Sequence, residues 1–98
     1  MNLPFVSIVI PAFNAASTIG QAIEACKNQD YPKDRLEIIV VDDGSRDNTK
    51  NVAESFGARY IYQENQGPAS ARNNGWKNSK GEVIFFTDAD CIPREDCL

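Results

Sequence analysis

Histidine is absent from the 98-residue chain, which also holds only three cysteines and one methionine. Without histidine, the sequence offers no His-based catalytic triad, no histidine zinc ligand and no histidine general base. The cysteines are Cys26, Cys91 and Cys97; no two have C-x-x-C spacing, so neither a zinc centre nor a disulfide framework is expected. Reduced thiols are typical of the cytosol, and the sequence therefore predicts a cytoplasmic protein.

Long apolar runs and an excess of basic charge are missing as well. No apolar run approaches the ~20 residues of a membrane-spanning helix, and no charged and apolar leader for secretion is visible at the N-terminus. Lys and Arg number 10 against 14 Asp and Glu, a net charge of −4, so nucleic acid is not expected as a partner. The chain is 42% hydrophobic and 24% charged, which suits one globular domain over residues 1–98.

Four short apolar runs alternate with three segments of helical character. The predicted strands lie near residues 5–10, 36–42, 58–62 and 82–87; the first two are apolar on both faces, as in a buried parallel sheet. Helical spacing follows at residues 19–26 and 49–56, and a third helix opens at Gly67-Pro68. We predict an α/β fold: a doubly wound, mostly parallel four-stranded sheet with helices on both faces and strand order 3-2-1-4.

Several residues carry local predictions. Pro11 is expected to end the first strand. Thr18 and Gln21 have the spacing of a capping box, and Asp47 is a predicted N-cap of the second helix. Trp76 is expected to pack partly buried.

The unusual polar residues follow the ends of strands one, two and four. In an open parallel sheet, ligands bind beyond the carboxyl ends of the strands, and a 3-2-1-4 order gathers these three loops around one crevice. We therefore expect the loops around Phe13, Asp43 and Asp90 to meet in a single cleft.

The pair Asp88 and Asp90, with Ala89 between them, offers two hard oxygen ligands for Mg²⁺ or Mn²⁺ at the mouth of a buried strand. A divalent ion there would hold the phosphates of a nucleotide. The alternative is that both acids are solvated turn or N-cap residues.

Two other loops have equally open interpretations. Asp42 or Asp43 could accept a hydrogen bond from a nucleobase or ribose, or Asp43 and Gly44 could form a turn while Ser45 or Asp47 caps the next helix. Phe13 could stack on a base and Asn14 could bond sugar or phosphate, or the first is a core residue and the second a turn residue.

Gly67 precedes the third helix, whose N-terminus would be an anion site, and Arg72 lies about one turn inside it. The alternative is an ordinary helix with a surface arginine. Neither the P-loop pattern nor G-x-G-x-x-G is present, which removes the main support for those nucleotide sites.

Four blocks, in order, resemble the N-terminal nucleotide-sugar-binding part of family 2 glycosyltransferases, which have the A-type glycosyltransferase fold. They are VSIVIPAFN at 6–14, VVDDGSRD at 40–47, NQGPASARN at 65–73 and GEVIFFTDAD at 81–90. The resemblance implies a nucleoside diphosphate sugar as donor, UDP-linked first of all, and Mn²⁺ or Mg²⁺ as cofactor.

The resemblance also implies site residues at the matching positions. Phe13 would lie beside the nucleobase, Asp43 would bond it, and Arg72 would approach the diphosphate. The implied nucleotide-sugar-binding residues are Pro11, Ala12, Phe13, Asn14, Asp42, Asp43, Gly67, Arg72, Asp88 and Ala89, and the implied metal ligands are Asp88 and Asp90.

Members of the family are usually much longer, and their acceptor-binding half and catalytic acid have no counterpart before Leu98. We therefore expect an N-terminal fragment without transfer activity of its own. A local departure from the family is Cys97, which stands where the family often has Trp.

For a complete enzyme the resemblance implies inverting transfer to a sugar or lipid-linked acceptor. It implies a place in the cytoplasm or at the inner face of the membrane, in cell-envelope polysaccharide synthesis. Pairing of two chains through an exposed sheet edge is also expected.

Two other classes of protein share parts of this pattern. A receiver-type phosphoacceptor domain has its acid pair after the first strand, where this chain has Pro11 and Phe13. A non-catalytic nucleotide-binding or oligomerisation module of the same fold stays open, and binding of a nucleoside diphosphate would distinguish it.

Overall fold

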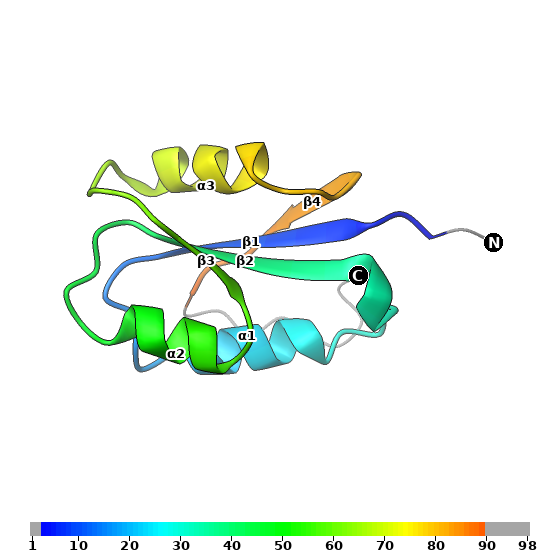
Figure 1. Cartoon of the computed structure of the whole chain (residues 1–98), viewed down its shortest axis with the longest axis horizontal. Coiled ribbons are helices and arrows are strands. Elements are labelled where there is room, and N and C mark those ends of the chain that lie inside the picture. The colour runs from blue at the N-terminus through cyan, green and yellow to red at the C-terminus, as the bar shows by residue number, and fades with distance from the viewer. Residues whose placement is uncertain (1–2, 90–98) are drawn as a thin grey trace.

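A computed structural model describes residues 3–89 of the chain. Its four strands form one sheet in the order β3-β2-β1-β4, and every neighbouring pair is parallel (Figure 1). The strands are β1 (Val6–Ala12), β2 (Leu36–Asp42), β3 (Arg59–Tyr62) and β4 (Val83–Phe86). The predicted strand order and parallel pairing are confirmed.

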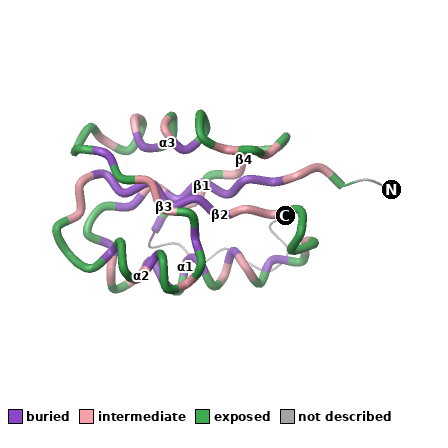
Figure 2. Tube along the Cα trace, viewed as in Figure 1, coloured by how far each residue is buried: buried purple, intermediate pink, exposed green. Residues whose placement is uncertain are grey.

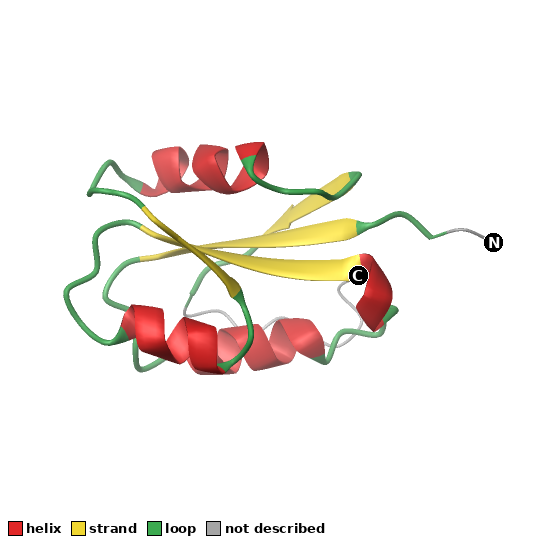
Figure 3. Cartoon of the chain, viewed as in Figure 1, coloured by secondary structure: helices red, strands yellow, loops and turns green. Residues whose placement is uncertain are grey.

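Helices cover both faces of this sheet, as predicted. Helices α1 (Ile19–Lys27) and α2 (Thr49–Ser55) lie on one face and α3 (Pro68–Lys77) lies on the other (Figures 1 and 3). A short 3₁₀ turn, Lys33–Arg35, precedes β2. Within residues 3–89, none of the helices has the length and apolar character of a membrane span.

The two faces of β1 explain why its residues are apolar in succession. Ile8 and Ile10 pack in the cluster that includes α1, whereas Val9 packs with Val41 and with Ala71 of α3. Successive side chains of a strand point to opposite faces, so both faces of a central strand must be apolar when helices cover both. Figure 2 shows the resulting buried stretch through the middle of the sheet.

Helix α3 lies close to the sheet because a glycine faces it. A Cβ placed on Gly75 would lie 2.3 Å from Cγ1 of Val9 and 3.1 Å from Cγ2 of Val41. The absence of a side chain at Gly75 thus sets how closely α3 can lie to β1 and β2.

Pro11 does not end β1, which continues to Ala12. The carbonyl of Val9 accepts a hydrogen bond from the N–H of Thr87, so the odd positions of β1 face β4. The ladder to β4 ends at the pair of Val9 and Phe86. Pro11 therefore sits beyond that ladder, on the side where a missing N–H breaks no strand pairing.

Three further local predictions are wrong. The Thr18 hydroxyl donates to the carbonyl of Ala15 at 3.4 Å, and its side chain does not cap α1. Trp76 is 56% exposed, because Ala71 and Gly75 occupy the buried side of α3. Asp47 is not the N-cap residue of α2, which is Asn48, although Oδ1 of Asp47 accepts a 3.1 Å hydrogen bond from the N–H of Thr49, the first residue of the helix.

Candidate functional site

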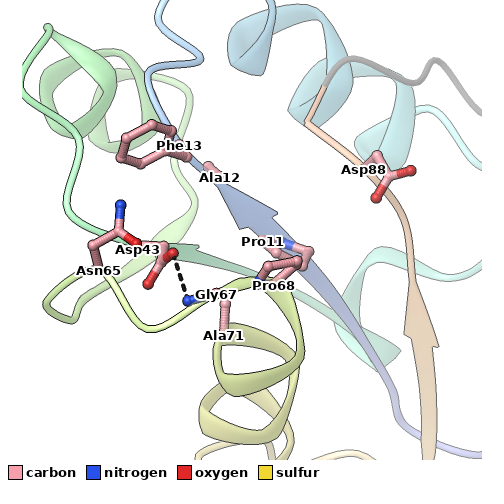
Figure 4. Close-up of a pocket in the computed structure, with 9 residues that line it drawn as sticks. All are labelled: Pro11, Ala12, Phe13, Asp43, Asn65, Gly67, Pro68, Ala71 and Asp88. Atoms are coloured by element: carbon pink, nitrogen blue, oxygen red, sulfur yellow. Dashed lines mark hydrogen bonds between the residues drawn. The ribbon is translucent and has the colours of Figure 1, made fainter.

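A pocket of about 330 Å³ opens at the carboxyl ends of the strands. It lies where parallel-sheet proteins bind their ligands, between the loop after β1 and the loop that enters α3. Its walls come from three strand ends and α3 (Figure 4). The lining residues are Pro11, Ala12, Phe13, Asp43, Asn65, Gly67, Pro68, Ala71 and Asp88.

Asp43 is the buried acid of this pocket, with 6% of its surface exposed. Its Oδ1 accepts hydrogen bonds of 2.8 Å from Nε2 of Gln63 and 2.8 Å from the N–H of Gln66. Its Oδ2 accepts one of 3.0 Å from the N–H of Gly67. Burial alone would raise the pKa of Asp43, but these three hydrogen bonds together hold the pKa below its ordinary value. The carboxylate is therefore ionised, an acceptor at one wall of the pocket.

Asp42 points to the other face of the sheet, as the pleat requires of a neighbouring residue. Its Oδ2 accepts a 2.5 Å hydrogen bond from the hydroxyl of Tyr60, and its Oδ1 accepts one of 2.8 Å from the N–H of Ser45. Burial first, and then the hydrogen bond and charge of Asp42, raise the pKa of Tyr60, so the hydroxyl stays a donor. Asp42 thus braces the turn after β2 and does not line the pocket.

Phe13 is 52% exposed at the rim of the pocket, so its interpretation as a core residue is wrong. Figure 4 shows its ring on the same side of the pocket as Asn65 and Asp43. Nothing in residue type singles out Asn65 in the sequence. The signal that could have found it is its place two residues before Gly67, at the approach to the helix N-terminus.

The loop after β1 is fastened to the loop after β2. Asn14, at φ 49°, receives a 2.9 Å hydrogen bond at Oδ1 from the N–H of Arg46, and its own N–H donates to Oγ of Ser45 at 2.7 Å. The N–H of Ala15 donates to Oγ1 of Thr49 at 2.9 Å. These bonds confirm Asn14 as a turn residue and tie the rim near Phe13 to the loop after β2 and to the start of α2.

Asp88 lies across the pocket from Asp43 and Asn65 (Figure 4). It is exposed, and within residues 3–89 its carboxylate has no hydrogen-bond partner. A second pocket of about 520 Å³ shares Pro11, Phe13 and Asp88 with the first, and it is also lined by Asn14 and Ala89. No group of three potential metal ligands occurs in the described part of the chain.

The structure therefore brings together six of the predicted residues: Pro11, Ala12, Phe13, Asp43, Gly67 and Asp88. Asn14 and Ala89 line the adjoining pocket. Arg72 is exposed and lines neither of these two pockets. Asp90, the second acid of the predicted metal pair, lies outside the described residues.

The sequence model described as Glycosyl transferase family 2 matches residues 7–98. The chain belongs to this family. Among its relatives, the glycosyltransferase AglE of Haloferax volcanii is 42% identical over 99% of this chain and 34% of its own length. This family 2 chain thus spans about a third of that relative.

Solved structures show the same fold. A mannosyltransferase of Pyrobaculum calidifontis, PcManGT, in complex with GDP-Man and Mn²⁺ superposes with a TM-score of 0.85 at 30% identity, over 96% of this chain and 30% of that one. S. aureus TarS in complex with UDP superposes with a TM-score of 0.86 at 29% identity, over 93% of this chain and 29% of that one. Both the family and the A-type glycosyltransferase fold implied by the resemblance are confirmed.

Proposed function

We propose that this chain binds the nucleoside diphosphate sugar donor of a glycosyltransferase, together with a divalent cation. The observation that carries the proposal is the pairing of an exposed aromatic ring, Phe13, with an ionised buried acceptor, Asp43, in one pocket at the strand ends. A ring that stacks on a base and an acceptor for a base N–H are the two elements that a nucleobase site needs. Relatives solved with UDP and with GDP-Man and Mn²⁺ support this choice of ligand class.

Uracil is the base that suits Asp43. A carboxylate has about four acceptor positions, and three hydrogen bonds from Gln63, Gln66 and Gly67 already reach this one. One remaining position suits a single N–H donor, which uracil presents between two carbonyl groups. We therefore propose a UDP-sugar as donor.

The carboxylate oxygens at the pocket mouth are ligands that fit a divalent cation. Asp88 supplies a hard carboxylate oxygen that no described residue engages, and Asp90 follows two residues later in the sequence. We propose that Asp88 and Asp90 would hold Mn²⁺ or Mg²⁺, which when bound offsets the diphosphate charge and stabilises it as a leaving group. Arg72 would add a second positive charge from the first turns of α3.

The remaining roles concern the full-length protein. We propose inverting transfer of the sugar to a hydroxyl of a sugar or lipid-linked acceptor, with a carboxylate base contributed by a segment after Leu98. We place that protein in the cytoplasm, at the inner face of the membrane, in cell-envelope polysaccharide synthesis. Residues 1–98 alone would bind the donor without transferring its sugar.

Calorimetric titration of the chain with UDP, with and without Mn²⁺, tests the proposal. Binding that requires the cation is the expected result, since Asp43 and Asp88 repel a diphosphate when no cation offsets their charge. Equal affinity under both conditions would contradict the metal role. Absence of binding under both would favour the non-catalytic module instead.

A further inference from the structure

Helix α3 and the loop residues directly beside it carry a net positive charge on a chain that is acidic overall, with the acids Glu64 and Glu82 toward the outer ends of the two flanking loops. Residues 65–81 contain Arg72, Lys77 and Lys80 and no Asp or Glu. The remaining residues carry seven Lys and Arg against 14 Asp and Glu. Solubility alone does not explain why positive charges gather on one surface of an acidic chain.

Trp76 lies in the middle of this basic surface. Ala71 and Gly75 face the sheet, and at 3.6 residues per turn Trp76 then projects away from it. Trp76 is 56% exposed, and it is the only tryptophan of the chain. We call the exposed residues Arg72, Asn73, Trp76, Lys77 and Lys80 the α3 outer face.

The composition of the α3 outer face favours a lipid surface over other partners. Protein interfaces have an apolar centre from which lysine is depleted, whereas here one large aromatic side chain stands among cations and an amide. Nucleic-acid affinity grows with the number of phosphates neutralised, and three cations neutralise few. Tryptophan prefers the headgroup level of a bilayer, and lysines beside it reach anionic headgroups.

The position of α3 in the fold allows such a contact. Helix α3 forms a layer of its own on the opposite face of the sheet from α1 and α2 (Figure 1). A flat surface can therefore approach α3 without meeting the other two helices. Charges on the far layer act weakly on that surface, because salt screens exposed charges over about 8 Å at physiological ionic strength.

We propose that the α3 outer face docks on an anionic lipid surface, with Trp76 among the headgroups and Lys77 and Lys80 facing lipid phosphates. This surface is separate from the residues that line the pocket, and its role does not rest on nucleotide binding. Arg72 is left out of the tests, because it has a proposed role at the diphosphate.

Tryptophan fluorescence and co-sedimentation with vesicles test the docking. Vesicles of phosphatidylcholine with phosphatidylglycerol in equal parts are compared with vesicles of phosphatidylcholine alone. Since Trp76 is the only tryptophan, a blue shift of its emission reports entry of this position into the headgroup region. The expected result is binding and a blue shift with the anionic vesicles, both lost at high salt.

Paired lysine variants locate the contact. Lys77→Gln with Lys80→Gln should lower the vesicle partition coefficient about 25-fold, since each lysine near an anionic surface contributes about fivefold. Lys33→Gln with Lys50→Gln changes the net charge equally at exposed sites in the 3₁₀ turn and α2, and should leave partitioning nearly unchanged. Trp76→Ala should weaken binding by co-sedimentation while the circular dichroism spectrum stays the same.

Three results would overturn the proposal. The first is no binding of the unsubstituted chain to anionic vesicles at low salt. The second is an equal loss in both lysine pairs, which would mean a non-specific charge effect. The third is an emission shift with a short single-stranded oligonucleotide but not with vesicles, which would assign the surface to nucleic acid.

Discussion

The Oδ2 atom of Asp43 accepts a 3.0 Å hydrogen bond from the N–H of Gly67 and so joins the end of β2 to the start of α3. Gly67 has φ 98°, a left-handed conformation that glycine adopts without strain. Oδ1 holds the same loop through the N–H of Gln66 at 2.8 Å. The acid proposed to bind the base is therefore also the residue that shapes the pocket wall.

Asp43→Asn should destabilise the fold by about 1–3 kcal/mol. The amide group of asparagine would place a donor against N–H groups that now point at a carboxylate. Urea unfolding at neutral pH measures the loss. Asp88→Asn is the matched control, an exposed acid of the same pocket without a hydrogen bond within residues 3–89, and should leave stability unchanged.

The pH dependence of this difference follows from the lowered pKa of Asp43. A carboxyl whose folded pKa lies below its unfolded value of 3.8 stabilises the fold above that value. The contribution is lost as the pH falls through the folded pKa. The stability advantage of the unsubstituted chain over Asp43→Asn should therefore shrink below about pH 4. A constant difference down to about pH 2 would contradict the role of the ionised form.

Phe13→Ala should reduce UDP affinity by about 5-fold to 150-fold in the presence of Mn²⁺, the loss expected for one stacked base. Stability should change by less than about 0.5 kcal/mol, because the ring is already half exposed. Calorimetry and urea unfolding measure the two effects. Trp76→Ala, which removes an exposed aromatic outside the pocket, should not alter UDP affinity, and an equal loss in both variants would refute stacking.

Gly75→Ala should destabilise the fold although alanine is the better helix former. The gain in helix propensity is about 1 kcal/mol, but the new Cβ would lie 2.3 Å from Cγ1 of Val9. Overpacking of this kind costs about 1–3 kcal/mol. In a Val9→Ala background, Gly75→Ala should cost less stability than in the unsubstituted chain, so the two substitutions should be coupled in a double-mutant cycle by urea unfolding. Additive effects would show that α3 can move away from the sheet.

Most of the sheet was predictable from the sequence because its signals are local and repeated. Val9 and Ile10 are both apolar, and only burial on two faces explains such a run. The outcome at Pro11 was not predictable, because it depends on how far the ladder to β4 extends. The prediction for Trp76 is wrong for a related reason: its side of α3 is set by the close approach of Gly75, which helical spacing alone does not reveal.

The candidate site was predictable as a set of loops but not as a set of roles. Asp42 and Asp43 are adjacent and chemically identical, and only the pleat sends the first to Tyr60 and the second to the pocket. Asp43 itself caps no helix: its carboxylate fastens the loop before α3 through the N–H groups of Gln66 and Gly67, and it also lines the pocket. Asn65 is marked in the sequence only by its place, two residues before Gly67.

Asp90→Ala should remove the metal dependence of UDP binding and most of the affinity. The reason is charge: without a cation, Asp43 and Asp88 oppose the diphosphate, and Arg72 alone offsets too little. Titration of UDP at several Mn²⁺ concentrations measures both effects. Phe13→Ala serves as the contrast, since it should weaken binding at every Mn²⁺ concentration and keep the metal response. A full metal response in Asp90→Ala would place the cation elsewhere.

The occupied acceptor positions of Asp43 predict which base is bound. Uracil offers one N–H between two carbonyls, and this matches the single position left on the carboxylate. Cytosine presents an acceptor at the same ring position and would face the ionised acid with a lone pair, so CDP should bind at least tenfold more weakly than UDP, about 1.4 kcal/mol. Guanine presents two adjacent N–H donors, and the carboxylate can serve only one of them.

Gln63→Ala removes the 2.8 Å hydrogen bond to Oδ1 and frees a second position, so it should raise GDP affinity relative to UDP. Competition calorimetry with the three diphosphates at saturating Mn²⁺ measures the order. Tighter binding of GDP than of UDP by the unsubstituted chain would mean that Asp43 acts only on the protein's own loop.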